Sequence, residues 1–242
     1  MGWYKQWFGT PWYALLYGHR DEFEAKVWVE AILAEWQLPA GSKVLDLACG
    51  RGRHARWLSE AGMLVTGIDI SPESIAFAQR SVPAARFCVH DMREPFADQE
   101  FDAICCLFTS LGYFDSIEDD QKVFASALGA LRPGGLFVLD FMNTAVVLSE
   151  LVPHEDITIE GVDFHIDRTI QQGAIVKQIS VNEGGEVHEF QEKVQALMPD
   201  QLEAMALQAG FKIMARTDGP DTSLFDPFLS KRFVLWMKRP VE

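Results

Sequence analysis

The sequence predicts an α/β fold: a seven-stranded, mostly parallel, doubly wound sheet with helices on both faces and a small antiparallel β insertion. Three observations support this prediction. Up to Met142, short apolar runs alternate with helical patterns, which is typical of a parallel sheet covered on both sides. Over residues 143–197, runs of alternating polar and apolar residues, separated by Gly-containing turns, replace that pattern. One helix and two more strand-like runs then complete the chain.

The expected helices follow from apolar spacing and from residues that begin or end a helix. Over residues 21–38, apolar residues recur at three- and four-residue steps, which predicts an amphipathic helix. Its expected apolar face holds Phe23, Val27, Ala31 and Ala34. Ser71 followed by Pro72 predicts a helix start, and Gly62 predicts the end of the helix that begins near His54. Further helices are expected at 120–131, 144–151 and 199–210.

The expected strands are short runs rich in Val, Ile, Leu and Phe. Those of the main sheet lie at 43–48, 63–69, 85–91, 101–108, 136–142, 211–217 and 231–238. The stretch RPGG at 132–135 is expected to form the turn that precedes the fifth strand. The insertion is expected to be an antiparallel meander of three or four strands.

The length and charge of the chain limit its organisation and its partners. With 242 residues, of which 48% are apolar and 23% charged, the chain is expected to form one domain over residues 1–242. Residues 1–38 are expected to form an aromatic and helical lid, and residues 143–197 a lid, a substrate-binding element or an interface. The net charge of −14, from 21 Lys and Arg against 35 Asp and Glu, repels nucleic acid and anionic lipid, so neither is expected as a partner.

Three further features predict a cytoplasmic protein that has no metal site. The four cysteines lie on apolar runs without CxxC spacing, which is typical of reduced thiols in a cytoplasmic protein. No apolar run approaches the ~18 residues that span a bilayer, so no membrane association is expected. The six histidines lack the spacing of metal ligands, so no metal site is expected.

The most informative stretch is VLDLACGRGRHA at 44–55. Gly50 and Gly52 follow a strand and open a helix, so the backbone there is able to approach a ligand closely. The letters GRGRHA also match the glycine pattern of dinucleotide sites, with Asp69 as the ribose carboxylate, and an NAD-dependent oxidoreductase is one interpretation. Asp46 argues against it, because a carboxylate beside a diphosphate is unfavourable, whereas it attracts a cationic ligand.

Two more carboxylates end neighbouring predicted strands. Asp69 and Asp91 are therefore expected at the edge of the sheet where open α/β folds bind ligands. One is placed to accept hydrogen bonds from ribose hydroxyls and the other from an exocyclic amino group. An adenosine with a positively charged tail matches these two residues and Asp46 better than a dinucleotide does. The neighbouring arginines are expected to form a solvated helix face: Arg51, Arg53 and Arg56.

Four motifs occur in order: VLDLACGRG, VTGIDIS, VHDMRE and LRPGGLFVLDF. Together they resemble the motifs of class I (Rossmann-like) S-adenosylmethionine-dependent methyltransferases of the small-molecule type. The resemblance covers residues 38–142 and extends through the last helix and strand pair, and the insertion after the fifth strand resembles the lids of such enzymes. It implies S-adenosylmethionine as cofactor and S-adenosylhomocysteine as product. The cofactor-binding residues that it implies are Tyr17, Arg20, Asp46, Ala48, Gly50, Gly52, Asp69, Ile70, Asp91, Met92 and Leu107.

The resemblance also implies roles for residues beside the carboxylates. Ile70 and Met92 are expected to flank the adenine. The N-terminal segment is expected to bind the methionine carboxylate through Tyr17 and Arg20, although Arg20 also has the helical spacing to pair with Glu24.

Methyl transfer from a sulfonium requires mainly that acceptor, methyl group and sulfur be aligned and that water be excluded. A general base is needed only if the acceptor atom carries a proton. The candidates for that base are Tyr113, His165 and Glu192, and each also has a structural interpretation.

The acceptor is expected to be a small, partly hydrophobic molecule at the carboxyl edge of the fourth and fifth strands. The residues expected beside it are Phe108, Tyr113, Phe114 and Asn143. The N-terminal aromatic residues are expected to cover it or, alone or with the β insertion, to form a homodimer interface: Trp3, Tyr4, Trp7, Phe8, Trp12 and Tyr13. A non-catalytic S-adenosylmethionine-binding interaction module is the alternative, because methyl transfer needs no diagnostic catalytic residue.

Overall fold

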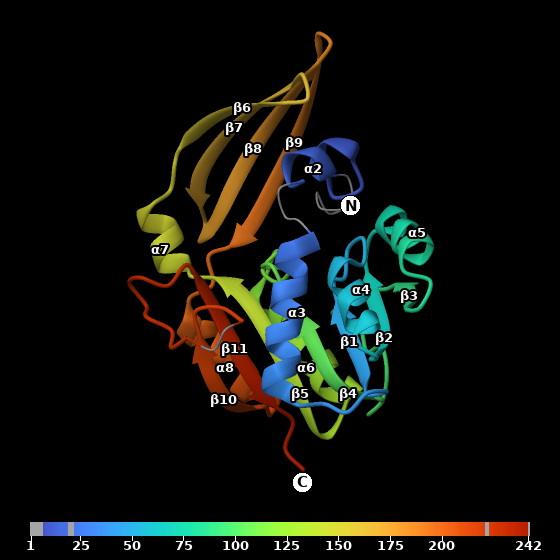
Figure 1. Cartoon of the computed structure of the whole chain (residues 1–242). Coiled ribbons are helices and arrows are strands. Elements are labelled where there is room, and N and C mark those ends of the chain that lie inside the picture. The colour runs from blue at the N-terminus through green and yellow to red at the C-terminus, as the bar shows by residue number, and fades with distance from the viewer. Residues whose placement is uncertain (1–6, 19–21, 221–222, 242) are drawn as a thin grey trace.

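A seven-stranded sheet forms the centre of the computed structural model, which describes residues 7–18, 22–220 and 223–241 (Figure 1). The strand order is β10-β11-β5-β4-β1-β2-β3, and β11 runs antiparallel to both of its neighbours. The strands are β1 (Lys43–Leu47), β2 (Leu64–Asp69), β3 (Arg86–Val89), β4 (Phe101–Cys106), β5 (Leu131–Met142), β10 (Lys212–Thr217) and β11 (Arg232–Lys238). The predicted mostly parallel sheet is confirmed.

Helices cover both faces of this sheet, as predicted for a doubly wound fold. The helices are α3 (Glu22–Trp36), α4 (Arg53–Glu60) and α5 (Pro72–Ser81) on one face, and α6 (Ile117–Ala130) and α8 (Pro199–Ala209) on the other. Neighbouring residues of β1 show the division, because Val44 packs into the core under α3, α4 and α5, whereas Leu45 packs into the core under α6 and α8. Among the described residues, no helix combines the length and apolarity that a membrane crossing requires.

The predicted apolar face of α3 is wrong. The residues that α3 buries are Ala25, Trp28, Val29, Ile32 and Trp36. Phe23 is 72% exposed and Val27 is 42% exposed, Ala34 is also exposed, and Ala31 is half-buried. Two faces of α3 carry apolar residues. The large rings of Trp28 and Trp36 determine which of these faces packs on the sheet.

The fifth strand also differs from its prediction. β5 begins at Leu131, so the sequence RPGG lies inside the strand and not in a turn before it. The strand is irregular there, because Gly134 has φ of +80° and the pairing with β4 shifts register between Phe101 and Ala103.

The β insertion forms a separate four-stranded antiparallel meander in the order β6-β7-β8-β9. Its strands are β6 (His154–Ile159), β7 (Val162–Gln171), β8 (Ala174–Glu183) and β9 (Glu186–Gln195), and α7 (Thr144–Ser149) connects it to β5. Figure 1 shows this sheet beyond the carboxyl edge of the main sheet, with α2 (Pro11–Leu16) beside β9.

The N-terminal segment packs on the insertion and shares a third hydrophobic core with it. Trp7 and Leu16 join Phe164 and Ile179 in this core, and Trp7 is 0% exposed. The aromatic residues at positions 7–17 therefore pack within the chain, whereas Trp3 and Tyr4 lie outside the described residues. Within the predicted lid at 1–38, α3 differs from this segment, because it packs on the main sheet.

Candidate active site

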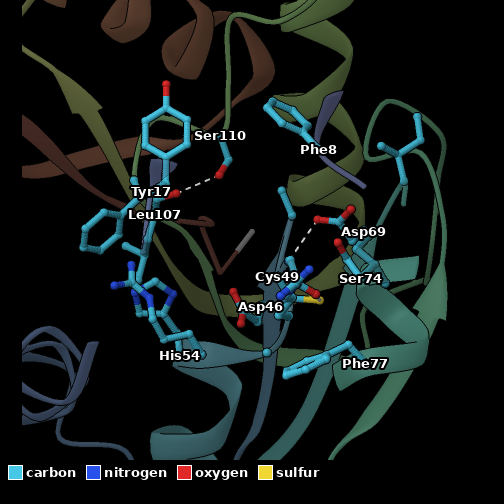
Figure 2. A pocket seen from close by; sticks show the side chains of 18 of the residues that line it. Phe8, Tyr17, Asp46, Cys49, His54, Asp69, Ser74, Phe77, Leu107 and Ser110 are labelled. Carbon is cyan, nitrogen blue, oxygen red and sulfur yellow. Dashed lines mark hydrogen bonds between the residues drawn. The ribbon is translucent and has the colours of Figure 1, made fainter. Parts of the chain in front are cut away.

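A cavity of about 450 Å³ opens at the carboxyl ends of β1, β2 and β4, beneath the segment around α2 (Figure 2). This volume is in the range of small-molecule sites. Every predicted cofactor-binding residue within the described part of the chain contributes to its wall. Arg20 lies outside the described residues. The structure thus brings together residues from Tyr17 to Leu107 that the sequence places far apart.

The glycine elbow between β1 and α4 forms the floor of the cavity. Ala48, Gly50 and Gly52 have φ of 59°, 54° and 82°, all in the left-handed region that favours glycine. A Cβ added to Gly52 would lie 3.0 Å from Phe87 Cζ, so the close packing of the elbow on β3 also requires glycine. Ala48 adopts this conformation despite its Cβ, which is the kind of backbone strain found at functional sites.

Asp69 fixes the elbow to the end of β2. Its Oδ2 accepts a hydrogen bond of 2.9 Å from the Gly50 amide, and its Oδ1 accepts one of 2.8 Å from the Ser71 amide. Burial raises the pKa of the carboxyl, and these amides oppose that effect. Each oxygen keeps a lone pair for hydroxyl groups of a ligand in the cavity.

Asp46 is the deepest carboxyl of the wall. It is 1% exposed, and its Oδ2 has no hydrogen-bond partner among the described residues. The Cys105 thiol lies 3.7 Å from Oδ1. Burial raises the pKa of Asp46 to about 7. Its open oxygen is therefore suited to a positively charged ligand group, which would stabilise the ionised carboxylate.

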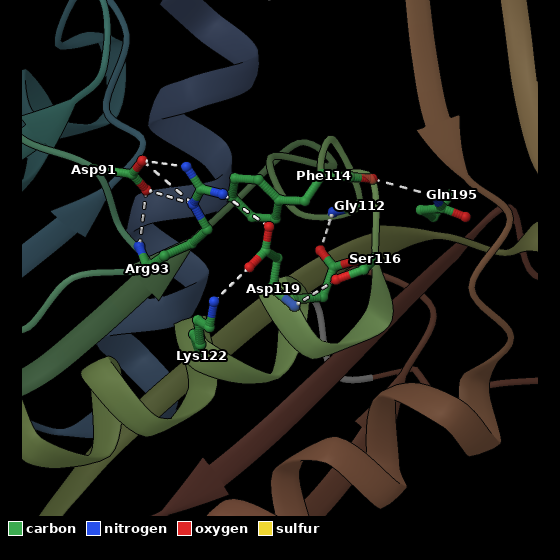
Figure 3. A network of polar contacts seen from close by, with 9 residues as sticks. Asp91, Arg93, Gly112, Phe114, Ser116, Asp119, Lys122 and Gln195 are labelled. Atoms are coloured by element: carbon green, nitrogen blue, oxygen red, sulfur yellow. Dashed lines mark hydrogen bonds and ion pairs between the residues drawn. The ribbon is translucent and has the colours of Figure 1, made fainter. Parts of the chain in front are cut away.

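Asp91 lies on the opposite side of the cavity and is held by Arg93 (Figure 3). The Arg93 guanidinium donates a hydrogen bond of 2.6 Å to Asp91 Oδ2 and one of 3.0 Å to Asp91 Oδ1. This pairing lowers the pKa of Asp91. Arg93 also donates a hydrogen bond of 2.8 Å to Asp119. Its guanidinium carbon lies 4.5 Å from the ring centroid of Phe114, which is another wall residue. Asp91 is thus a preoriented carboxylate with part of its hydrogen-bonding capacity already used.

The hydroxyl of Tyr17 is engaged by two residues of the insertion. It donates a hydrogen bond of 2.8 Å to Glu192 and accepts one of 2.8 Å from Lys177, so it points toward the insertion. Glu192 is buried and also accepts 2.6 Å from Trp7 Nε1. Tyr17 therefore contributes its ring to the cavity, and its hydroxyl joins the N-terminal segment to β8 and β9.

The three candidates for a general base lie in different environments. Tyr113 lines the cavity, with its ring edge-to-face against Phe8 at 5.3 Å. His165 is not on the cavity wall, because strand alternation places it on the exposed face of β7, where Nδ1 lies 2.6 Å from Asp156. Glu192 is also absent from the wall and is occupied by Trp7, Tyr17 and Lys177. Only Tyr113 retains the geometry of its prediction.

Two other predictions about the wall need correction. Asn143 is 0% exposed and donates to the carbonyls of Pro227 and Ser230, so it supports the β10–β11 connection and does not reach the cavity. Arg53 does not belong to a solvated face, because it lines the cavity, pairs with Glu24 at 3.1 Å and lies 4.4 Å from the ring centroid of Phe108.

His54 is one of several wall residues that the sequence did not predict. Its side chain is 8% exposed and lies against Phe108, with ring centroids 5.1 Å apart. Nε2 has no hydrogen-bond partner among the described residues. The available signal was its position, because the second residue of a helix that follows a glycine elbow lies next to the bound ligand.

Comparison with known proteins identifies the family. A family model described as a methyltransferase domain matches residues 44–135. The putative methyltransferase YqeM of Bacillus subtilis (strain 168) is 34% identical over 173 residues, which cover 70% of this chain and 67% of that protein. The chain belongs to the class I S-adenosylmethionine-dependent methyltransferases.

Other relatives agree with this membership. A dTDP-3-amino-3,4,6-trideoxy-alpha-D-glucopyranose N,N-dimethyltransferase of Streptomyces venezuelae is 30% identical over 129 residues, which is 53% of this chain and only 54% of that enzyme. The crystal structure of an S-adenosylmethionine-dependent methyltransferase from Clostridium acetobutylicum superimposes with a TM-score of 0.81 at 19% identity, covering 94% of this chain and 95% of the other. This methyltransferase therefore shares its fold along nearly the whole chain.

The cavity fits S-adenosylmethionine, the cofactor of the family. A Cβ added to Gly50 would meet no atom within 4 Å, so the elbow there leaves space for a ligand; Asp46 Oδ2 is buried without a partner among the described residues, and a cation would stabilise its ionised form; and Asp69 has free lone pairs. Among the described residues, no group of three or more His, Cys, Asp or Glu side chains is arranged to hold a metal ion.

Removing the Arg93 guanidinium is expected to weaken cofactor binding without unfolding the protein. In Arg93→Met, Asp91 and Phe114 lose their common support, and we expect about a three- to tenfold higher Kd for S-adenosylhomocysteine, from the loss of one or two charged hydrogen bonds. Calorimetry measures this change. Arg132→Met is the matched control, because Arg132 pairs with Asp102 at 2.7 Å away from the cavity wall. An equal effect of both substitutions would contradict the role of Arg93.

Proposed function

We propose that this methyltransferase transfers a methyl group from S-adenosylmethionine to a small-molecule acceptor, enclosed between the carboxyl edge of the main sheet and a composite lid. The observation that carries this proposal is the meeting of Asp46, Asp69 and Asp91 in one cavity at the glycine elbow. The composite lid consists of the N-terminal segment at 7–18 and the β insertion at 143–197, which share one hydrophobic core.

Each wall residue has a role that follows from its contacts. When bound, S-adenosylmethionine supplies a methyl group activated by the positive charge on sulfur. Asp69 accepts hydrogen bonds from the ribose hydroxyls, because its oxygens are already fixed by two amides. Asp46 accepts from the ammonium group, whose charge favours the ionised carboxylate. Asp91 accepts from the adenine amino group, with Ile70 and Met92 against the ring.

The acceptor side of the cavity is aromatic. The ring centroid of Phe8 lies 5.0 Å from that of Tyr13 and 5.3 Å from that of Tyr113, and all three rings line the cavity. These rings are placed to exclude water and to align the acceptor with the methyl group, which is the main requirement of the reaction. Of the three predicted candidates for a general base, Tyr113 lines the wall, and its phenolate form would accept a proton if the acceptor atom carries one.

The aromatic side of the cavity and the burial of Asp46 bear on the two alternative interpretations. A non-catalytic interaction module has no need of an aromatic compartment between the cofactor residues and the lid. An NAD-dependent oxidoreductase has to accommodate a diphosphate beside Asp46, whose buried open oxygen would repel it. Both features favour methyl transfer.

Asp69→Ala is expected to raise the Kd for S-adenosylmethionine about tenfold to a hundredfold, because a carboxylate that accepts ribose hydroxyls contributes about 1.5–3 kcal/mol. Calorimetry provides the measurement. Asp163→Ala is a suitable control, since among the described residues the Asp163 carboxylate accepts from Thr158 on the exposed face of the insertion and is not on the cavity wall. Binding of the Asp69 variant within twofold of the wild type would remove the ribose assignment.

The acceptor is best sought with a methyl-transfer screen read as release of S-adenosylhomocysteine. Amino sugars and amino acids come first, because relatives of this chain are named as a dTDP-amino-sugar N,N-dimethyltransferase and as glycine N-methyltransferase. We expect turnover with a small molecule that fits the aromatic compartment. Turnover with a polynucleotide or a protein and with no small molecule would contradict the proposal.

A further inference from the structure

We propose that His54, with Arg53, binds the methionine carboxylate of S-adenosylmethionine and makes the site selective for nucleotides that carry this carboxylate. The inference rests on the proposed function and assigns one end of the cofactor to residues of α4. It replaces the predicted contact with the Tyr17 hydroxyl, which is engaged by Glu192 and Lys177.

The imidazole of His54 carries a nitrogen without a hydrogen-bond partner among the described residues. The side chain is 8% exposed, it lies on the cavity wall, and its Nε2 has no partner among the described residues (Figure 2). A buried polar atom without a partner is destabilising, and on a cavity wall a bound ligand is able to supply that partner. The ring is held in place by Phe108, at a centroid distance of 5.1 Å and an interplanar angle of 30°.

Two polar atoms of the cavity-wall residues lack hydrogen-bond partners among the described residues. Asp46 Oδ2 and His54 Nε2 both lack partners among the described residues, and both residues line the same cavity. The methionine end of the cofactor carries one ammonium and one carboxylate. A carboxylate oxygen such as Asp46 Oδ2 is able to bind only the ammonium, whereas the imidazole N–H of His54 and the guanidinium of Arg53 are wall groups that are able to donate to the carboxylate.

The surroundings of His54 on the cavity wall include the positive charge of Arg53. Arg53 also lines the cavity, and its guanidinium shares the Phe108 ring with the imidazole. Burial and the neighbouring charge of Arg53 lower the pKa of His54 to about 3, so the ring is neutral and carries one N–H. The N-terminus of α4 adds a further positive potential. This environment favours an anion and disfavours the ammonium.

The test compares S-adenosylmethionine with decarboxylated S-adenosylmethionine, which keeps the ammonium and lacks only the carboxylate. In His54→Phe, which keeps a flat ring against Phe108, we expect about a tenfold or greater rise in the Kd of S-adenosylmethionine, as for loss of a hydrogen bond to a charged group. The Kd of the decarboxylated nucleotide should change by less than about twofold, since that nucleotide makes no such bond. His54→Gln, which keeps an N–H donor, should recover most of the lost affinity. Calorimetry with melting temperatures of each variant provides both readouts.

The outcomes separate this inference from its alternatives. Equal losses for the two nucleotides would overturn it, because His54 would then contact the ammonium or act only through packing. An unchanged affinity for S-adenosylmethionine in His54→Phe would overturn it as well. Failure of the wild-type protein to bind either nucleotide would instead contradict the proposed function on which the inference rests.

Discussion

Asp46→Asn is expected to stabilise the cofactor-free protein and to abolish most of its cofactor affinity. Burial raises the pKa of Asp46 from 3.8 to about 7, so ionisation in the folded state costs about 4 kcal/mol. An unpaired amide costs about 1–3 kcal/mol, which leaves a net gain of about 1–3 kcal/mol. Because the pKa is raised in the folded state, the stabilising effect of protonation is complete below the unfolded pKa and is lost as pH rises to about 7. The difference in the free energy of unfolding between Asp46→Asn and the wild type should therefore increase as the pH rises from the unfolded pKa of 3.8 to about 7, and it should stay constant at higher pH.

The same substitution removes the charge that binds the ammonium. Loss of one partner of a buried charge pair costs about 2–5 kcal/mol, so we expect about a hundredfold or greater rise in the Kd of S-adenosylmethionine. Denaturant unfolding and calorimetry at about pH 8, where Asp46 is ionised, measure the two opposite effects.

Asp120→Asn is the matched control for Asp46→Asn. Asp120 is also 0% exposed, its pKa is also raised to about 7, and its Oδ2 also lacks a partner among the described residues. It accepts 2.9 Å from the Gly112 amide and is not on the cavity wall. We expect a similar gain in stability and an unchanged cofactor affinity. Near-wild-type binding by Asp46→Asn, or equal losses in the two variants, would contradict the role of Asp46.

Trp7→Ala is expected to open the lid and to remove turnover while cofactor affinity changes little. Trp7 is 0% exposed and donates a hydrogen bond of 2.6 Å to Glu192, and its ring centroid lies 4.6 Å from that of Phe190. Truncation of this side chain should therefore destabilise the packing of the lid by about 3–5 kcal/mol. It is not on the cavity wall, so contacts to the cofactor remain. Hydrogen exchange of the segment at 7–18 and the insertion measures the opening, and turnover is measured with the acceptor found by the screen.

Trp12→Ala serves as the comparison within the same segment. Trp12 makes a solvent-exposed hydrogen bond of 3.0 Å to Glu183 and lies beside His188, so a smaller effect on exchange and turnover is expected. If Trp7→Ala turned over the acceptor as fast as the wild type, the segment would not act as a lid, and its aromatic residues would serve another purpose, such as a subunit interface.

The cofactor side of the site was predictable because it depends on local rules. Parallel strands bring their carboxyl ends to one edge of the sheet, so Asp46, Asp69 and Asp91 had to meet once the strands were assigned. The positive φ of Gly50 and Gly52 likewise follows from the elbow between a strand and a helix.

The lid and the substrate side were less predictable because they depend on contacts between distant segments. The bond between Trp7 and Glu192 joins residues 185 positions apart, and no periodic pattern encodes it. That contact, with Lys177, turns the Tyr17 hydroxyl away from the cavity. His165 failed as a base candidate for a different reason: no residue of the insertion is on the cavity wall, and the opposite face of β7 packs into the third hydrophobic core through Phe164 and Ile166.

The central claim is that the cavity at the glycine elbow binds an adenosine with a cationic methionine tail. The most direct test is calorimetric titration of the full chain with S-adenosylmethionine, S-adenosylhomocysteine and NAD under identical conditions. The account predicts saturable one-site binding of both sulfur nucleotides and no heat from NAD. Binding of NAD without binding of either sulfur nucleotide would contradict it.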